Sequence, residues 1–306
     1  MTQGTVDLLP EDVRKQITIH YGDITDGHFL STLLEREHVT EELYHLAAQS
    51  FVGYSFQNAL STHDANIGGM LNVCNAIKDS SPDTRKCFTA TSELFGQPKE
   101  TPQNEMMPFF PRSPYAVSKL AGIWMMRTYR EAYKLYMANG ILFNLESEVR
   151  GGSLRPERSP RSWQGSPMGQ RILSYSGTLA PLRTGGYARD YVEGMRKMLQ
   201  QDYPDDFVLG TNESHTVREF AEAAFRTIGK SITWKGSGVN EVGLSEDGGT
   251  LVKVNREFFR PLESDNYRGD YSKAMKKIGW EPRTKFGDLV KIMVESDIRK
   301  LEANQS

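Results

Sequence analysis

The sequence predicts an α/β fold in which a doubly wound parallel sheet is followed by a smaller α+β domain. Two observations favour this fold. Short β-rich runs alternate with helical segments through the first half of the 306-residue chain, which is typical of a parallel sheet covered by helices. The second half begins with loops rich in glycine, proline and arginine over 150–187 and ends in helices. We place the two domains at 1–149 and 150–306, and expect the helix and strand at about 188–211 to return to the sheet.

Each element of the first half is predicted from its local pattern. The β-rich runs at 16–23, 85–92 and 139–144 are the strand candidates. The helix candidates have apolar residues at helical spacing and lie at 29–38, 58–80 and 113–137. The pair Gly68-Gly69 interrupts the second of these helices, and 42–48 is an apolar run that ends in small residues.

The second half is predicted in the same way. Residues 188–202 form a helix candidate and 206–210 a strand candidate. A helix over 216–230 begins at a plausible threonine cap and ends near Gly229. Two closing helices are expected at 270–282 and 286–302.

Composition excludes several classes of protein. Lys and Arg number 37 against 39 Asp and Glu, and this balance argues against a nucleic-acid binder, which would carry an excess of basic residues. The sequence has neither a long apolar run nor a signal peptide, so we expect no membrane contact. The only two cysteines, Cys74 and Cys87, cannot build a disulfide framework or a structural zinc site. We therefore expect a cytoplasmic protein without a metal.

Tyr115 and Lys119 are the first candidate for chemistry. They lie four residues apart at the start of a predicted helix, so both side chains lie on one face. An ammonium beside a phenol lowers the pKa of the phenol, which could then take a proton from a hydroxyl group. A surface tyrosine beside a solvated lysine is the alternative for so short a motif.

Thr91 and Glu93 strengthen this candidate. The run Thr91-Ser92-Glu93 follows the β-rich residues RKCFTA (85–90). In an open parallel sheet, ligands bind at the carboxyl ends of the strands. A hydroxyl, a carboxylate and an activated tyrosine could therefore meet at one substrate, although Glu93 could instead cap a helix.

A family resemblance rests on longer stretches. HYGDITD (20–26), LAAQSFV (46–52), ATSELFG (90–96), PFFPRSPYAVSKL (108–120) and NGILFNLES (139–147) carry it in the first half. DFVLGT (206–211), VREF (217–220), NEVG (240–243), FFRPLESD (258–265) and GWEPR (279–283) continue it. With these stretches the chain resembles the GDP-mannose 4,6-dehydratases, of the extended short-chain dehydrogenase/reductase type, which have a Rossmann-type sheet.

The resemblance implies a reaction. NADP would carry a hydride from C4 of GDP-mannose and return it to C6, giving GDP-4-keto-6-deoxymannose. Thr91 would bond the sugar 4-hydroxyl, and Tyr115 with Lys119 would remove its proton. Glu93 would take the C5 proton and help to expel the C6 hydroxyl as water.

The resemblance also implies binding residues. Those for the cofactor are Asp23 and Ile24 at the adenine, the stretch Leu46, Ala47, Ala48, Gln49 and Ser50 along the ribose and phosphates, Lys119 at the nicotinamide ribose, and Arg150. Those for the nucleotide sugar are Asn144, Arg158 (a lysine in the family), Arg183, Arg260 and Glu263.

The front of the chain departs from the family pattern. No glycine-rich turn precedes residue 20, where the family has a strand, this turn and a helix at the cofactor's pyrophosphate. In the doubly wound order 3-2-1-4-5-6, strands 2 and 1 separate strand 3 from strand 4. We therefore expect an incomplete dinucleotide-binding domain over 1–149, a strand at 16–20 without a neighbour, an exposed strand at 42–47, and weak NADP binding.

The nucleotide-sugar domain over 150–306 departs as well. Its loops 144–151 and 183–192 differ from the family motifs, Pro156 and Pro160 fall where the family starts a helix, and Ser61 replaces a tyrosine near the nicotinamide. A non-catalytic relative that associates with a full-length subunit is therefore the main alternative to a homo-oligomeric dehydratase. A different nucleotide-sugar epimerase is disfavoured, because Glu93 suits removal of the C5 proton.

Overall fold

A computed structural model describes residue 6 and residues 9–37, 41–149, 173–176, 182–183, 185–255 and 267–303. Within these ranges, no helix has the length and apolar character needed to cross a membrane.

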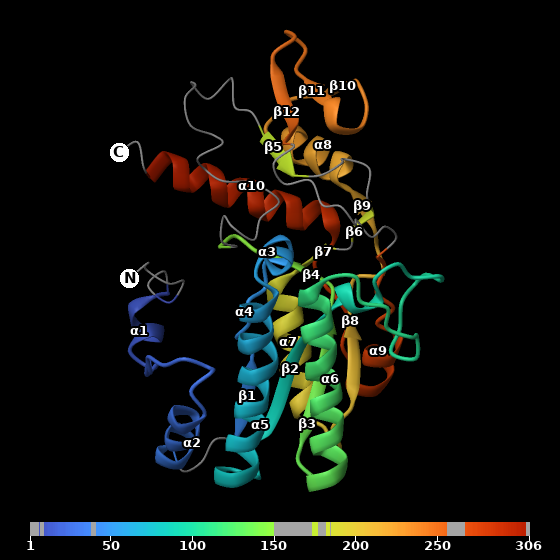
Figure 1. The fold of residues 1–306 in the computed structure, drawn as a ribbon. Coiled ribbons are helices and arrows are strands. Elements are labelled where there is room, and N and C mark those ends of the chain that lie inside the picture. The colour runs from blue at the N-terminus through green and yellow to red at the C-terminus, as the bar shows by residue number, and fades with distance from the viewer. Residues whose placement is uncertain are drawn as a thin grey trace.

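A four-stranded parallel sheet forms the centre of the larger part of the molecule (Figure 1). Its strands lie in the order β1 (Glu42–His45), β2 (Arg85–Thr91), β3 (Met137–Leu142) and β8 (Asp206–Leu209). Residues of β3 are buried throughout, and those of β2 are buried except at its two ends. Such strands are expected where helices cover both faces of a parallel sheet.

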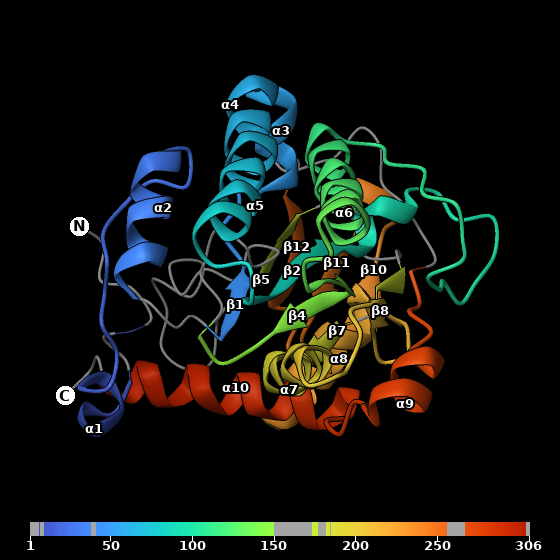
Figure 2. The same cartoon turned by 90° about the horizontal axis from the view of Figure 1, so that it is seen from below.

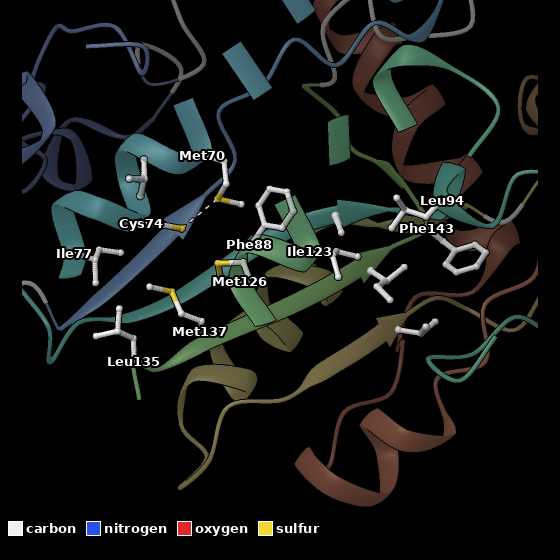
Figure 3. Packing of buried hydrophobic residues seen from close by; sticks show 14 of the residues in the cluster. Met70, Cys74, Ile77, Phe88, Leu94, Ile123, Met126, Leu135, Met137 and Phe143 are labelled. Carbon is white, nitrogen blue, oxygen red and sulfur yellow. Dashed lines mark hydrogen bonds between the residues drawn. The ribbon is translucent and has the colours of Figure 1, made fainter. Parts of the chain in front are cut away.

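Helices cover both faces of this sheet (Figure 2). α5 (Gly69–Ser80) and α6 (Pro114–Tyr133) cover one face, and α2 (Gly27–Arg36) lies against α5. Their apolar residues meet side chains of β2 and β3 in one buried cluster (Figure 3). α7 (Ala188–Leu199) and α9 (Ser272–Ile278) cover the other face, where a second cluster surrounds Tyr191 and Trp280.

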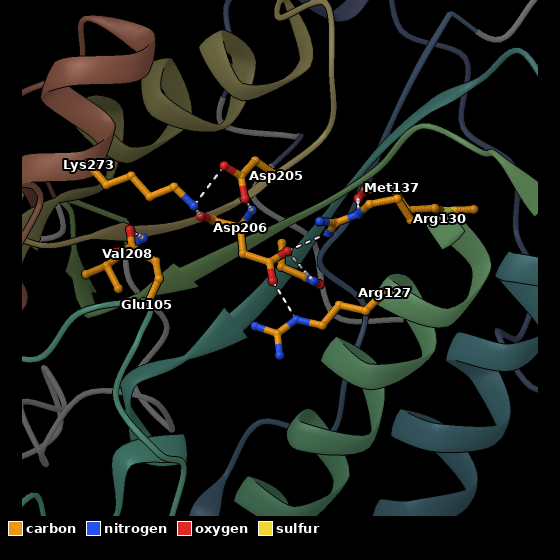
Figure 4. A network of polar contacts seen from close by, with 9 residues as sticks. Glu105, Arg127, Arg130, Met137, Asp205, Asp206, Val208 and Lys273 are labelled. Atoms are coloured by element: carbon orange, nitrogen blue, oxygen red, sulfur yellow. Dashed lines mark hydrogen bonds and ion pairs between the residues drawn. The ribbon is translucent and has the colours of Figure 1, made fainter. Parts of the chain in front are cut away.

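The Asp206 carboxylate fastens β8 to its neighbours (Figure 4). It accepts hydrogen bonds from Arg127 Nε at 2.6 Å, Arg130 Nη2 at 2.5 Å and Asn139 Nδ2 at 2.7 Å. Burial works to raise the pKa of Asp206, but the two guanidinium groups outweigh it and hold that pKa below its usual value. Because Arg127 and Arg130 belong to α6, the network fixes that helix across the end of the sheet.

The smaller part contains a second sheet with the order β10 (Thr233–Lys235), β11 (Val242–Leu244), β12 (Thr250–Asn255) and β5 (Leu173–Ser176). α8 (Val217–Thr227) packs on it, and α10 (Phe286–Ala303) lies against α8. The predicted threonine cap is confirmed: Thr216 and Glu219 form a reciprocal capping box at the start of α8. The strands β5, β10, β11 and β12 were not predicted from the sequence.

The remaining elements are short. They are α1 (Glu11–Arg14), α3 (Val52–Gln57), α4 (Ala59–His63), η2 (Asp64–Gly68), η3 (Ser92–Phe95), η5 (Gly238–Asn240), and the paired strands β4 (Asn144–Glu146) with β7 (Gly185–Tyr187) and β6 (Leu182–Arg183) with β9 (His215–Thr216).

The strand predicted at 16–23 is wrong. No described residue pairs with this segment, and Ile17, Ile19 and Tyr21 are exposed to 42%, 49% and 78%. A strand needs a neighbour to bond its backbone groups, and the sheet ends at β1.

Several helix boundaries also differ from prediction; for example, the helix predicted over 270–282 spans Ser272–Ile278. The pair Gly68-Gly69 does not interrupt a helix, because α4, the π-helical turn η2 and α5 follow one another without a break. A larger residue at Gly69 would force Ile24 to shift, since a Cβ atom would lie 2.8 Å from Ile24 Cγ2. The helix predicted to reach 137 ends at Tyr133, where Lys134 adopts a left-handed conformation with φ 57°.

Candidate functional site

The predicted catalytic residues lie at the carboxyl edge of the large sheet. Thr91 is the last residue of β2, and Tyr115 is the second residue of α6. The loop 46–50 follows β1, and β4 begins at Asn144 just after β3 ends. This edge is where parallel α/β sheets bind ligands.

The turn η3 presents Glu93 beside Thr91. Thr91 Oγ1 accepts a hydrogen bond from the Glu93 backbone N–H at 3.3 Å and so caps the turn. Two further hydrogen bonds hold the far end of η3: Phe110 N–H donates to the Leu94 carbonyl at 2.8 Å, and the Tyr267 hydroxyl donates to the Gly96 carbonyl at 2.8 Å. The Glu93 backbone is thus fixed from both sides.

Tyr115 is placed by the start of α6. Ser113 caps this helix by accepting from the Ala116 N–H at 3.1 Å, and Pro114 occupies the first turn, where a missing N–H costs nothing. Tyr115 is buried, and burial raises its pKa to about 12. A hydrogen bond from Thr91 works in the opposite direction, and the negative charge of Glu93 adds to the rise. Thr91, Glu93 and Tyr115 therefore share one electrostatic environment.

Lys119 follows one turn later on α6 and is buried as well. Its Nζ donates to the Thr89 carbonyl at 2.8 Å and lies 4.7 Å from the centre of the Phe88 ring. Burial lowers its pKa to about 7. The expected lowering of the Tyr115 pKa by Lys119 is wrong for this structure, because burial dominates the phenol and the ammonium contacts the Thr89 carbonyl.

The loop 46–50 is held by Asn66 of η2. Asn66 Oδ1 accepts from the Gln49 N–H at 2.8 Å, and its Nδ2 donates to the Gln49 carbonyl at 3.0 Å. The same Nδ2 donates to Ser118 Oγ at 2.9 Å, next to Lys119 on α6. Gln49 Oε1 is buried and has no partner among the described residues. These hydrogen bonds tie the loop 46–50 to α6.

The other two predicted cofactor residues precede α2. Asp23 is exposed, and its carboxylate accepts from the Thr25 N–H at 2.9 Å and the Thr25 hydroxyl at 2.8 Å, which lowers its pKa. Ile24 packs against the cluster under α5. The helix α2, which follows these residues, lies on the β1 side of the sheet (Figure 2).

A family model for GDP-mannose 4,6 dehydratase matches residues 2–293. The chain belongs to the GDP-mannose 4,6-dehydratase family. It is 44% identical over 289 residues to GDP-mannose 4,6 dehydratase 2 of Caenorhabditis elegans, with 94% of this chain and 75% of that protein covered. It is 41% identical over 295 residues to the human GDP-mannose 4,6 dehydratase, with 95% and 79% covered.

Solved structures agree on the fold. The UDP-glucose 4-epimerase of Thermotoga maritima with UDP-glucose superposes with a TM-score of 0.78 at 19% identity, covering 98% of this chain and 89% of that one. RMD from Pseudomonas aeruginosa complexed with NADPH gives 0.75 at 18% identity, covering 92% and 88%. The Rossmann-type fold of this GDP-mannose 4,6-dehydratase family member is thereby established.

The predicted nucleotide-sugar residues are placed only in part. Asn144 is half-buried in β4, opposite Gly185 of β7. Arg183 lies in β6, but its side chain falls outside the described part of the chain, and Arg150, Arg158, Arg260 and Glu263 lie outside the described residues altogether. Ser61 is exposed on α4.

Asn66, Ser118 and Tyr267 support the site in this family member but were not predicted. Asn66 and Ser118 are 52 positions apart, and Tyr267 meets Gly96 across 171 positions. A polar residue inside an apolar helix face, such as Asn66, is the only local signal that points to such a role.

Proposed function

We propose that this chain converts GDP-mannose to GDP-4-keto-6-deoxymannose with NADP as a hydride carrier. Family membership supports the reaction, and one observation carries the assignment of residues: Thr91, Glu93 and Tyr115 interact at the carboxyl end of β2. A hydroxyl, a carboxylate and a phenol are the groups needed to hold a sugar hydroxyl, take a C–H proton and take an O–H proton.

The residues at the sheet edge fit a dinucleotide. The loop 46–50 offers the small residues Ala47 and Ala48 for close approach and the unpartnered Oε1 of Gln49 as an acceptor. Lys119 would hold the nicotinamide ribose, Arg150 the cofactor, and Asp23 and Ile24 the adenine. When bound, NADP would supply the hydride chemistry that oxidises C4 of the mannose ring and reduces C6.

The side chains then divide the proton transfers. Thr91 holds the sugar 4-hydroxyl, and Tyr115 takes its proton as a phenolate, which the positive charge of a bound nicotinamide ring would stabilise against the effect of burial. Oxidation at C4 makes the neighbouring C5–H acidic, and Glu93 takes this proton and delivers it to the departing C6 hydroxyl, which leaves as water. When hydride is returned to C6, Tyr115 gives C5 the proton that it took from the 4-hydroxyl, so the protons balance. Asn144, Arg158, Arg183, Arg260 and Glu263 would bind the nucleotide sugar.

The reaction is tested by incubating the full chain with GDP-mannose and NADP. We expect a product lighter by one water that carries a keto group, detected by mass spectrometry. Turnover of UDP-glucose without turnover of GDP-mannose would contradict the substrate assignment.

We also propose that the chain self-associates through the outer face of α4, α5 and α6. Four large apolar side chains are exposed there: Leu60 to 76%, Leu71 to 39%, Val117 to 44% and Trp124 to 55%. Apolar side chains gathered on adjacent helices favour burial against a second copy. Sedimentation should show an oligomer that Trp124→Glu dissociates. If both proteins are monomeric, the proposal is wrong.

The edge of β1 supports the alternative, association with a full-length subunit. β1 has a neighbour on one side only among the described strands, and Leu46 beyond it is 58% exposed. Unpaired strand edges accept strands from other chains.

Both Cys74 and Cys87 are free and buried, which supports a reducing compartment such as the cytoplasm.

A further inference from the structure

Lys86 lies completely buried between β2 and α5, in the apolar core below the candidate site. Its relative exposure is 0%. Among the residues that the structure describes, its Nζ has two hydrogen-bond partners, and both are sulfur atoms: Met70 Sδ at 3.0 Å and Cys74 Sγ at 3.4 Å. Met70 and Cys74 are one turn apart on α5, and the Cys74 thiol donates to Met70 Sδ at 3.8 Å (Figure 3).

This environment is unusual for a lysine. An ammonium group has three donors and is normally met by water or oxygen atoms, and sulfur is a weak acceptor. Burial accordingly lowers the pKa of Lys86, and the nearby Cys74 opposes this shift only in part. A lowered pKa favours the free amine, which has a lone pair and is a nucleophile, and the Nζ atom lies 3.4 Å from the Cys74 sulfur.

We propose that Cys74 and Lys86 form a redox-controlled covalent bridge in which one oxygen atom links Sγ to Nζ. The oxidant is hydrogen peroxide. A first peroxide converts the Cys74 thiol to a sulfenic acid and leaves as water. A second peroxide takes two electrons and two hydrogens, one from the S–O–H group and one from the Lys86 amine, and the O–N bond forms. In sum, one thiol, one amine and two peroxides give one S–O–N bridge and three waters.

The location limits which reagents can take part. Cys74 and Lys86 are both 0% exposed, so bulky electrophiles are excluded while peroxide, with two heavy atoms, can enter during local opening. Cys74 lies within two turns of the π-helical turn η2, where backbone hydrogen bonding changes register. Two dithiols supply the four electrons that restore the thiol and the amine.

The bridge would join α5 to β2 covalently. Since β2 ends at Thr91, the oxidised protein would carry a cross-link five residues before the candidate site. We expect the cross-link to raise the melting temperature by restricting the unfolded chain, as a disulfide does.

The test uses the full-length chain treated with a small excess of peroxide. We expect a species heavier by about 14 Da, the mass of one oxygen less two hydrogens. Dithiothreitol should remove it, and peptide mapping should join the peptides that contain Cys74 and Lys86. Cys87 serves as a matched control, because it is also buried but belongs to the cluster on the opposite face of the sheet. Cys87→Ser should still form the bridge.

Cys74→Ser and Lys86→Met should not form it. Lys86→Met keeps the length of the side chain and removes a buried polar group, so this variant is expected to fold. Two results for the wild-type protein would each overturn the proposal: a gain of about 16 or 32 Da at sulfur without a cross-linked peptide, or no change in mass. This part of the test does not depend on whether the variants fold.

Discussion

The side-chain nitrogen of Asn66 lies 2.9 Å from the hydroxyl oxygen of Ser118, and the same amide group holds both backbone groups of Gln49. Asn66 therefore joins the loop after β1 to the helix that carries Tyr115 and Lys119. The two halves of the candidate site, one proposed for cofactor binding and one for chemistry, are positioned by a single side chain.

Asn66→Ala tests this joint. The change removes three hydrogen bonds and leaves buried backbone groups of Gln49 unpaired, which costs about 1–3 kcal/mol of stability. We expect NADP affinity to fall as well, measured by calorimetric titration. Asn75→Ala is the control, because Asn75 accepts a hydrogen bond from the Tyr129 hydroxyl on α6 but does not touch the loop. Equal NADP affinity in both variants would show that Asn66 has a structural role alone.

Glu93→Gln tests the base that acts at C5. Glutamine keeps the shape of the side chain but cannot take a proton, so dehydration should slow by about 10²–10⁴-fold while C4 oxidation continues. A single-turnover experiment should show NADPH absorbance that rises without release of water from the sugar. Glu100→Gln, an exposed acid in the following loop, should retain full activity. Product formation at the normal rate by Glu93→Gln would assign the base elsewhere.

Tyr115→Phe tests the base that acts at the 4-hydroxyl. Without the phenolic oxygen, neither C4 oxidation nor product formation is expected, and no NADPH absorbance should appear in a single turnover. Tyr133→Phe is a matched control at the exposed far end of α6. Near-normal turnover by Tyr115→Phe would show that Tyr115 does not act as the base and that the Tyr115–Lys119 motif has a structural role alone.

The parts of the fold that sequence predicts well are those with strong local signals. α6 has a serine cap and a proline in its first turn, and α8 has a capping box, so both starts were predicted to within a residue. β2 and β3 were recognised from short β-rich runs. The second sheet was missed because three of its strands span only three or four residues, and β12 pairs with β5 from a distant part of the chain.

The grouping of Thr91, Glu93 and Tyr115 at one edge of the sheet was also predictable from the sequence. Thr91 and Glu93 follow a strand and Tyr115 starts a helix, so topology alone brings them to one edge of the sheet. The electrostatics were not predictable. Lys119 is directed at the Thr89 carbonyl, and burial sets the pKa values of Tyr115 and Lys119. Burial depends on tertiary packing, which a motif of five residues does not contain.

The buried amine of Lys119 gives the protein a defined pH dependence of stability. Burial lowers its pKa from 10.5 to about 7, so between these values the unfolded chain binds more protons than the folded one. Stability therefore rises with pH, by about 2 kcal/mol from pH 7 to pH 9 for this group. The shift of His45, whose pKa falls from 6.5 to about 2, acts below pH 7. That of Cys87, whose pKa rises from 9.0 to about 12, opposes the rise in stability as the pH approaches 9, and that of Tyr115, from 10.0 to about 12, opposes it above pH 9. Both residues remain in a Lys119 variant, so their contributions cancel when the two proteins are compared.

Denaturant unfolding at pH 7, 8 and 9 measures this slope, and Lys119→Met should reduce it by about 1 kcal/mol per pH unit. Lys86 is also buried and contributes a slope in the same direction, but it is present in both proteins and cancels in the comparison. Lys277→Met removes an exposed lysine of α9 and should leave the slope unchanged. If Lys119→Met and the wild type show the same slope, the Lys119 side chain is hydrated in solution and its amine is charged at neutral pH.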